Sequence, residues 1–173
     1  MIALVLGGAR SGKSSLAEQL VARLGAPVTY VATMDPRGDP ELEERIAEHR
    51  DRRDPGWQTV EADDDLAATL ASLTGTVLVD SLGPWVARFG GLAGGVDVTS
   101  LCAALRARSG DTVVVSDEVG LSVHPSTAEG RWFRDELGAV NTAVSGIADA
   151  AFLVVGGRAL PLPTPGLPEL PES

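Results

Sequence analysis

The segment Gly7-Gly8-Ala9-Arg10-Ser11-Gly12-Lys13-Ser14 constrains the fold more than any other part of the sequence. It fits the pattern G-x-x-x-x-G-K-S and stands between a short apolar run, residues 2–6, and residues 16–24, in which leucine and valine recur at helical spacing. The glycines let the backbone turn so that successive N–H groups face an anion, and the following helix adds the positive end of its dipole. Strand, glycine-rich turn and helix together predict a phosphate-binding loop for a nucleoside triphosphate.

Two side chains of this loop have predicted chemical roles. Lys13 is expected to reach the β- and γ-phosphates, and the Ser14 hydroxyl is expected to bind Mg²⁺. The whole loop is expected to contact the nucleotide, namely Gly7, Gly8, Ala9, Arg10, Ser11, Gly12, Lys13 and Ser14. A second metal ligand is expected at Asp80, which ends the apolar run of residues 76–80 in the Walker-B manner. An aspartate after a strand also suits turn geometry, but beside a phosphate-binding loop the metal role is favoured.

Apolar runs that alternate with helical patterns predict an α/β fold with a largely parallel central sheet flanked by helices. Strands are expected at residues 2–6, 28–32, 76–80, 112–117 and 151–155, with a short extended segment at 57–61. Helices are expected after the loop, at residues 40–52, 64–73, 81–89 and 100–108, and again after residue 126. A chain of 173 residues with this pattern predicts a single P-loop NTPase domain of the RecA-like type.

Two helix starts carry more detailed expectations. Asp63 or Asp64 is expected to cap the helix of residues 64–73, because an aspartate side chain accepts a hydrogen bond from the first helical N–H groups. Ser126 and Glu129 have the spacing of a capping box and are expected to begin the last long helix.

The C-terminal end is expected to lie outside the sheet. Five prolines stand between Pro161 and Pro171, and proline disfavours both helix interiors and sheet ladders. We therefore expect a P-loop domain at residues 1–157, whose last strand is 151–155, followed by a proline-rich tail at residues 158–173.

Composition narrows the class of partner. The net charge is −10 and the pI is 4.6, which argues against nucleic acid, since that binding is driven by Lys and Arg on phosphates. No apolar run approaches the ~18–20 residues that span a bilayer, and residues 2–6 are too short for a signal peptide. The single cysteine, Cys102, excludes an internal disulfide and disfavours a structural zinc site. We expect a cytoplasmic protein that neither binds nucleic acid nor spans a membrane.

His49 is one of two histidines in the chain, and its position leaves two interpretations open. It shares one face of the expected helix at residues 40–52 with Leu42 and Ile46. It is either a partly buried histidine that ends an apolar stripe or a nucleophile or acid–base group that faces the nucleotide. Spacing does not separate the two. The other histidine, His124, precedes a proline in an expected loop and is interpreted as a surface residue.

Four blocks of sequence share the pattern of one enzyme family. The loop at residues 7–14 has the form G-G-x-R-S-G-K-S, and residues 30–33 read Y-V-A-T. The third block is R-I-A-E-H-R at residues 45–50, followed by Arg53 and by W-x-T-x-E at 57–61. The fourth is E-V-G at 118–120, with F-R-D at 133–135 and then Asn141. Together they resemble the bifunctional adenosylcobinamide kinase/adenosylcobinamide-phosphate guanylyltransferases of cobalamin biosynthesis, over residues 2–155.

The resemblance implies two reactions. ATP or GTP donates its γ-phosphate to the hydroxyl of the aminopropanol arm of adenosylcobinamide, with Lys13 and Mg²⁺ stabilising the charge. His49 then attacks the α-phosphate of GTP, carries GMP as a phosphoramidate and passes it to the new phosphate, giving adenosyl-GDP-cobinamide. The resemblance thus favours the catalytic interpretation of His49, and it also implies a homotrimer.

The resemblance implies further contacts with GTP. Guanidinium groups next to His49 suit the phosphates, and the carboxylate of Glu61 suits the N1 and N2 hydrogens of guanine. The implied contacts are Ala32, Thr33, Met34, Arg50, Asp51, Arg52, Arg53, Glu61 and Asp80.

The chain departs from the family pattern at two positions. Glu48 stands where some relatives have a second histidine, so we do not expect that position to be needed for guanylyl transfer. Asp117 stands where relatives often have asparagine before E-V-G. Two alternatives remain: a P-loop small-molecule kinase that never uses His49, and a nucleotide-binding regulatory module, which the intact loop and Asp80 disfavour.

Overall fold

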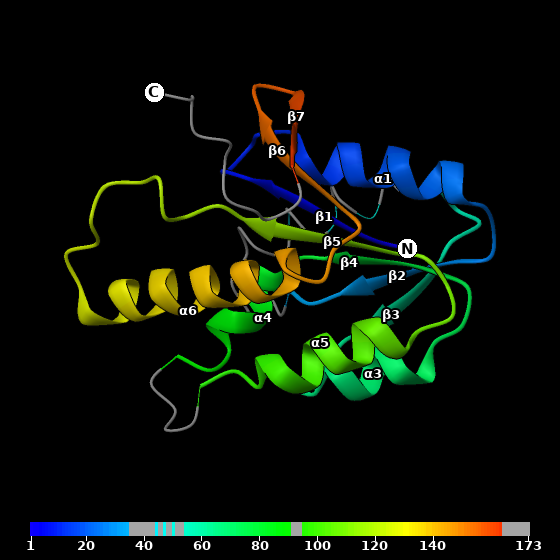
Figure 1. Ribbon diagram of the computed structural model, residues 1–173, viewed down its shortest axis with the longest axis horizontal. Coiled ribbons are helices and arrows are strands. Elements are labelled where there is room, and N and C mark those ends of the chain that lie inside the picture. The colour runs from blue at the N-terminus through cyan, green and yellow to red at the C-terminus, as the bar shows by residue number, and fades with distance from the viewer. Residues whose placement is uncertain (35–43, 45–46, 48–49, 51–53, 91–94, 164–173) are drawn as a thin grey trace, which may run out of the picture.

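The computed structural model describes residues 1–34, 44, 47, 50, 54–90 and 95–163. Within these residues the chain forms one seven-stranded sheet with helices on both faces (Figure 1). The strands are β1 (Ile2–Gly7), β2 (Val28–Ala32), β3 (Gln58–Glu61), β4 (Thr76–Asp80), β5 (Thr112–Asp117), β6 (Ala150–Val155) and β7 (Arg158–Leu162). The helices are α1 (Lys13–Leu24), α3 (Leu66–Ser72), α4 (Leu82–Ala87), α5 (Val98–Ala107) and α6 (Ala128–Ser145).

The strand that leads into the phosphate-binding loop, β1, lies inside the sheet. The strand order is β3-β2-β4-β5-β1-β6-β7, and every neighbouring pair is parallel except β6–β7. β5 therefore separates β1 from β4, the strand that ends at Asp80. The parallel strands bring their carboxyl ends to one edge, at the left in Figure 1. The expected α/β fold, a P-loop domain with a largely parallel sheet, is confirmed.

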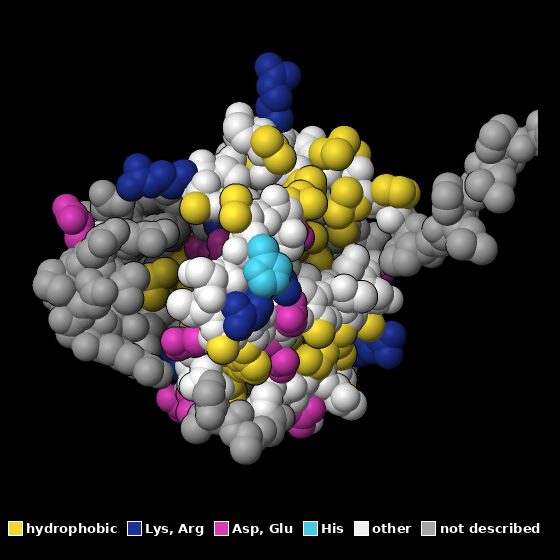
Figure 2. All heavy atoms as spheres, turned by 90° about the vertical axis from the view of Figure 1, so that its left-hand side faces the viewer, with side chains coloured by type: hydrophobic (Ala, Val, Ile, Leu, Met, Phe, Trp, Pro, Cys, Tyr) yellow, Lys and Arg dark blue, Asp and Glu magenta, His cyan; other side chains and the backbone are white. Residues whose placement is uncertain are grey.

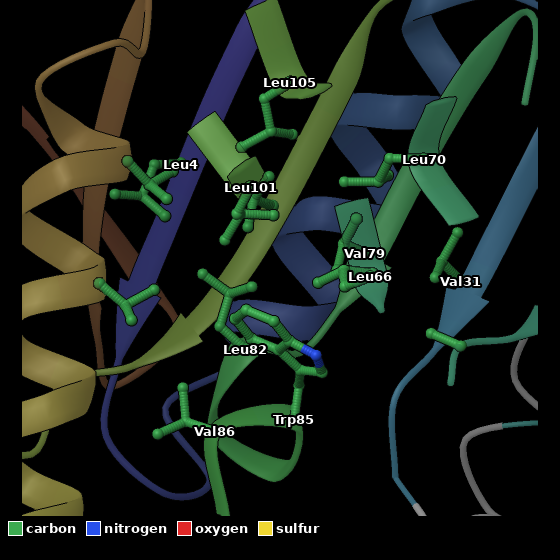
Figure 3. Packing of buried hydrophobic residues seen from close by; sticks show 14 of the residues in the cluster. Leu4, Val31, Leu66, Leu70, Val79, Leu82, Trp85, Val86, Leu101 and Leu105 are labelled. Carbon is green, nitrogen blue, oxygen red and sulfur yellow. The ribbon is translucent and has the colours of Figure 1, made fainter. Parts of the chain in front are cut away.

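Different helices cover the two faces of the sheet. α1 packs on one face, where its Val21 belongs to the same buried cluster as Val5. The other described helices cover the opposite face (Figure 1). There Leu66, Trp85 and Leu101 form one cluster with Leu4 of β1 (Figure 3). All six residues of β1 are buried, which is why its sequence is continuously apolar rather than alternating.

Two helices are capped by other residues than expected. α3 is capped by Asp65 rather than by Asp63 or Asp64, and α6 by Thr127 rather than by Ser126. In both, the capping side chain accepts a hydrogen bond from the backbone N–H three residues later, at 2.8 Å in α3 and 3.0 Å in α6. Neighbouring residues of similar capping ability compete, and the tertiary position of the helix decides between them. Across the described residues, no helix combines the length and apolarity needed to cross a bilayer.

The expectation that the sheet ends at Val155 is wrong. Gly156 and Gly157 have positive φ, +57° and +75°, and form a tight turn into β7, which pairs antiparallel with β6. Pro161 lies opposite Phe152 in this pair. A proline is tolerated there because β7 is an edge strand, whose outer side needs no N–H donor. The sheet thus continues past residue 157 to Leu162, and the expected tail falls mostly on residues 164–173, outside the described part.

Candidate active site

The predicted site residues gather at the carboxyl edge of the sheet. β1 leads into the phosphate-binding loop, and β2, β3 and β4 end at Ala32, Glu61 and Asp80. Ala32 is in register with Glu61 on one side and with Asp80 on the other, so these three residues lie side by side. Figure 2 looks onto this edge, where ligands bind in open α/β sheets.

The backbone of the loop has the conformation that anion binding requires. Gly12 has φ +94° and Arg10 φ +56°, and the Ser11 N–H donates to Gly8 O at 3.2 Å. A Cβ at Gly7 would overlap the Ser11 side chain and would lie 2.8 Å from Val154 O. Only glycine therefore fits at this position. α1 begins at Lys13, so the positive end of its dipole points into the loop.

Lys13 is held by two acceptors. Its Nζ lies 2.7 Å from Asp117 Oδ1 and donates to Gly8 O at 3.2 Å. The Lys13 side chain is only 13% exposed, so the ion pair is partly shielded from water. Sequence reasoning noted Asp117 only as a departure from the family pattern. A strand that ends in an acid next to β1 is the same type of feature that identified Asp80.

Ser14 and Asp80 lie together, as predicted. Ser14 Oγ donates to Asp80 Oδ1 at 3.2 Å, although β5 separates β4 from β1, the strand that leads into the loop and α1. Tyr30 OH donates to the other oxygen, Oδ2, at 2.9 Å, and Asp80 is 8% exposed. A hydroxyl and a carboxylate are oxygen donors of the kind that Mg²⁺ prefers, and this ion takes few ligands from the protein. No group of three or more His, Cys, Asp or Glu suited to a metal occurs among the described residues.

The Thr33 side chain is bonded within the protein. It is fully buried, its hydroxyl donates to Ser81 O at 2.5 Å, and the same oxygen accepts from Ser81 N at 3.0 Å. These bonds tie the end of β2 to the residue after Asp80. The nucleotide contact expected at Thr33 remains a prediction, and so do those at Met34, which is half-buried, and at Glu61, which is exposed.

The segment around His49 lies largely outside the described residues. His49, Asp51, Arg52 and Arg53 all fall there, together with most of the helix expected at 40–52. Arg50 is described, and it is helical and exposed. The roles of these residues therefore remain predictions. His124 is exposed, which confirms that it is a surface residue.

The fourth sequence block supports the loop from β5. The Glu118 N–H donates to Gly7 O at 3.1 Å, and its carboxylate accepts from Gly120 N at 2.6 Å. Asn141 on α6 donates from Nδ2 to Asp117 O at 3.0 Å. This block therefore fixes the end of β5 against the phosphate-binding loop.

Comparison with known proteins identifies the same family as the four sequence blocks do. Residues 3–162 match the family described as cobinamide kinase / cobinamide phosphate guanyltransferase. The chain is 40% identical over 177 residues to the bifunctional adenosylcobalamin biosynthesis protein CobP of Pseudomonas aeruginosa, an alignment that covers 95% of this chain and 98% of that protein.

Solved structures are similar in fold. A prototypical ATPase from the type III secretion system of pathogenic bacteria matches with a TM-score of 0.58 and 12% identity, over 88% of this chain and 50% of that one. The RadB recombinase matches with a TM-score of 0.50 and 18% identity, over 88% of this chain and 73% of that one. At these identities the similarity concerns the P-loop fold alone.

Proposed function

Because the chain belongs to the cobinamide kinase / cobinamide phosphate guanyltransferase family, we propose that its carboxyl-edge site performs both family reactions in sequence. The protein is a bifunctional transferase of cobalamin biosynthesis that phosphorylates a cobinamide and transfers GMP to the product. The observation that carries the proposal is the hydrogen bond between Ser14 and Asp80, which joins the phosphate-binding loop to the Walker-B strand.

In the first reaction, ATP or GTP donates its γ-phosphate to the hydroxyl of the aminopropanol arm of adenosylcobinamide. The loop N–H groups of residues 7–14 bind the phosphates, and Lys13 exchanges Asp117 for the β- and γ-phosphate oxygens. The bond from the hydroxyl oxygen to phosphorus forms as the bond to the β-phosphate breaks, and a nucleoside diphosphate leaves.

Ser14 and Asp80 fit Mg²⁺ by their chemistry, since both offer oxygen and lie within hydrogen-bond distance of each other. When bound, this ion neutralises charge on the phosphate oxygens. Tyr30 holds the Asp80 carboxylate in place from the buried side.

In the second reaction, His49 attacks the α-phosphate of GTP and pyrophosphate leaves. The resulting phosphoramidate passes GMP to the phosphate of adenosylcobinamide phosphate, giving adenosyl-GDP-cobinamide. We assign the phosphates of this GTP to the loop at residues 7–14 together with residues 50–53, and the guanine base to Glu61, with Ala32, Thr33 and Met34 beside it. We further propose that the protein is cytoplasmic and that it forms a homotrimer. Sedimentation of the purified chain tests the trimer.

The two reactions are separated by one labelling experiment. Purified protein is incubated with Mg²⁺ and GTP labelled at the α-phosphate, without corrinoid, and then denatured. Label that stays on the protein and is lost in mild acid but not in base identifies a phosphoramidate. We expect it on the wild type and on H124A, whose histidine is exposed, but not on H49A. Absence of label from the wild type would leave the kinase reaction alone.

A further inference from the structure

Arg88 joins the exits of two strands at the candidate active site. It caps the C-terminus of α4, and its side chain is 13% exposed. Nη2 donates to Thr33 O at 2.5 Å and Nη1 to Ala62 O at 2.7 Å. Thr33 and Ala62 are the first residues after β2 and β3. One planar guanidinium therefore fixes the distance between the two exits.

The same residues are tied to each other and to β4. Ala62 N donates to Ala32 O at 2.8 Å, and the Thr33 hydroxyl is bonded to both backbone groups of Ser81. Arg88 also lies 3.7 Å from the Asp64 carboxylate, which is 77% exposed. The guanidinium is thus the buried link of a polar cluster that holds three adjacent strand ends.

This cluster lies at the end of the site away from the phosphate-binding loop. β4 and β5 separate β2 from β1 in the sheet. Three inter-strand spacings of about 4.8 Å each amount to roughly 14 Å. An extended nucleoside triphosphate covers such a distance, so a nucleotide whose phosphates lie in the loop is long enough to place its base at the exits of β2 and β3.

We propose that Arg88 is a positioning residue for the base of the nucleotide. It holds Thr33 and Ala62, and through them the neighbouring Met34 and Glu61, in the arrangement that receives guanine. The inference rests on the proposed function, which assigns the base to these residues. Because Arg88 acts through other residues, its loss weakens binding of the base without weakening binding of the phosphates.

A second partly buried arginine provides a matched control. Arg108 donates to three backbone carbonyls, those of Leu70, Leu73 and Gly75, at 2.9, 2.8 and 2.7 Å. It lies beside Thr112 at the start of β5, which is the opposite edge of the sheet. Changing either arginine to methionine removes the same type of bond, but only Arg88 is at the proposed base site.

The test compares two probes by isothermal titration calorimetry in Mg²⁺. The first is α,β-methylene-GTP, which cannot release pyrophosphate, and the second is inorganic tripolyphosphate, which has no base. For R88M we expect the Kd of the nucleotide to rise about tenfold, because loosened exits are less preorganised. The Kd of tripolyphosphate should stay within about twofold of the wild-type value. R108M should leave both constants within about twofold even where it lowers thermal stability.

R88K keeps the charge but lacks the planar fork, and it should give an intermediate nucleotide affinity. It also provides the measurement if R88M does not fold. Equal changes in both probes, or no change in either, would overturn the role of Arg88. If the wild type itself bound tripolyphosphate as tightly as the nucleotide, the base site would be wrong, and the inference would fail together with that part of the proposed function.

Discussion

At the scale of single residues, Lys13 has a competitor for the phosphates. Asp117 Oδ1 lies 2.7 Å from its ammonium, and the two side chains are 13% and 28% exposed. A phosphate that binds Lys13 must replace this carboxylate, and it also meets the negative charge of Asp117. We therefore expect Asp117 to lower the affinity of the loop for polyphosphates.

We predict that D117N tightens binding of tripolyphosphate in Mg²⁺. Asparagine can still accept a hydrogen bond from Lys13, so the geometry is kept while the charge is lost. The free energy of a partly exposed ion pair corresponds to a change of about two- to fivefold in Kd. Calorimetry measures this change. In a K13M background the effect of D117N should shrink, because the ion pair is absent. Weaker binding by D117N would instead show that the carboxylate assists the nucleotide.

The contacts of single residues also show which parts of the site can be predicted from the sequence. Lys13, Ser14 and Asp80 were predicted together because a short motif and a strand-ending acid define them locally, and the Ser14–Asp80 bond confirms the pairing. Arg88 was not predicted. Its acceptors lie 55 and 26 residues away in the chain, and only the strand order brings them to it.

At the scale of elements, helix caps contribute through their charge state. Asp97 caps α5, accepting from Ser100 N at 2.9 Å and from Ser100 Oγ at 2.7 Å. These two bonds lower the pKa of the Asp97 carboxyl below its usual 3.8. A carboxyl whose pKa is lowered by folding stabilises the folded state at pH values above its unfolded-state pKa. This stabilisation is lost as the pH falls through the folded-state pKa.

We predict that D97A lowers the melting temperature by a constant amount near neutral pH and by progressively less as the pH falls below about 4, because the carboxyl of the unfolded wild type then takes up a proton before that of the folded state. Thermal melts followed by circular dichroism between pH 7 and pH 3 measure this difference. D63A serves as a control, since it removes an exposed carboxylate that does not cap α3. A difference for D97A that stayed constant down to pH 3 would contradict an ionic cap.

Strands were predicted correctly where a long apolar run marks them. The prediction failed where the position of a segment in the sheet decides whether it forms a strand. The runs at β1, β2, β4 and β5 are apolar enough to identify buried strands, and their alternation with helices predicts a parallel sheet but not the order of its strands. β7 was missed because Pro161 argues against a strand, and only its edge position makes the proline acceptable. Because β7 was not predicted, its antiparallel pairing with β6 was not predicted either.

At the scale of the whole molecule, β7 connects the edge of the sheet to the active site. The turn between β6 and β7 donates a hydrogen bond from Gly157 N to Ser11 O at 2.8 Å, which braces the phosphate-binding loop. A Cβ at Gly12 would lie 3.3 Å from Gly157 Cα, so the two segments are in close contact. Leu162, near the end of β7, packs against the main hydrophobic cluster. The hairpin thus belongs to the folded domain and supports the loop.

Two truncations distinguish this domain boundary from the one at residue 157 that the prolines suggest. A chain ending at Pro163 keeps β7, and we predict that its melting temperature and its affinity for tripolyphosphate match those of the full chain.

A chain ending at Gly157 loses β7 and exposes the unpaired backbone N–H and C=O groups of β6, which favours aggregation. It also loses the burial of Leu162, worth about 1–2 kcal/mol for a partly buried leucine. We therefore expect a lower melting temperature and, because the turn that braces Ser11 is no longer held, a weaker affinity for tripolyphosphate. Equal stability and affinity for the two truncations would mean that the hairpin supports neither the fold nor the loop.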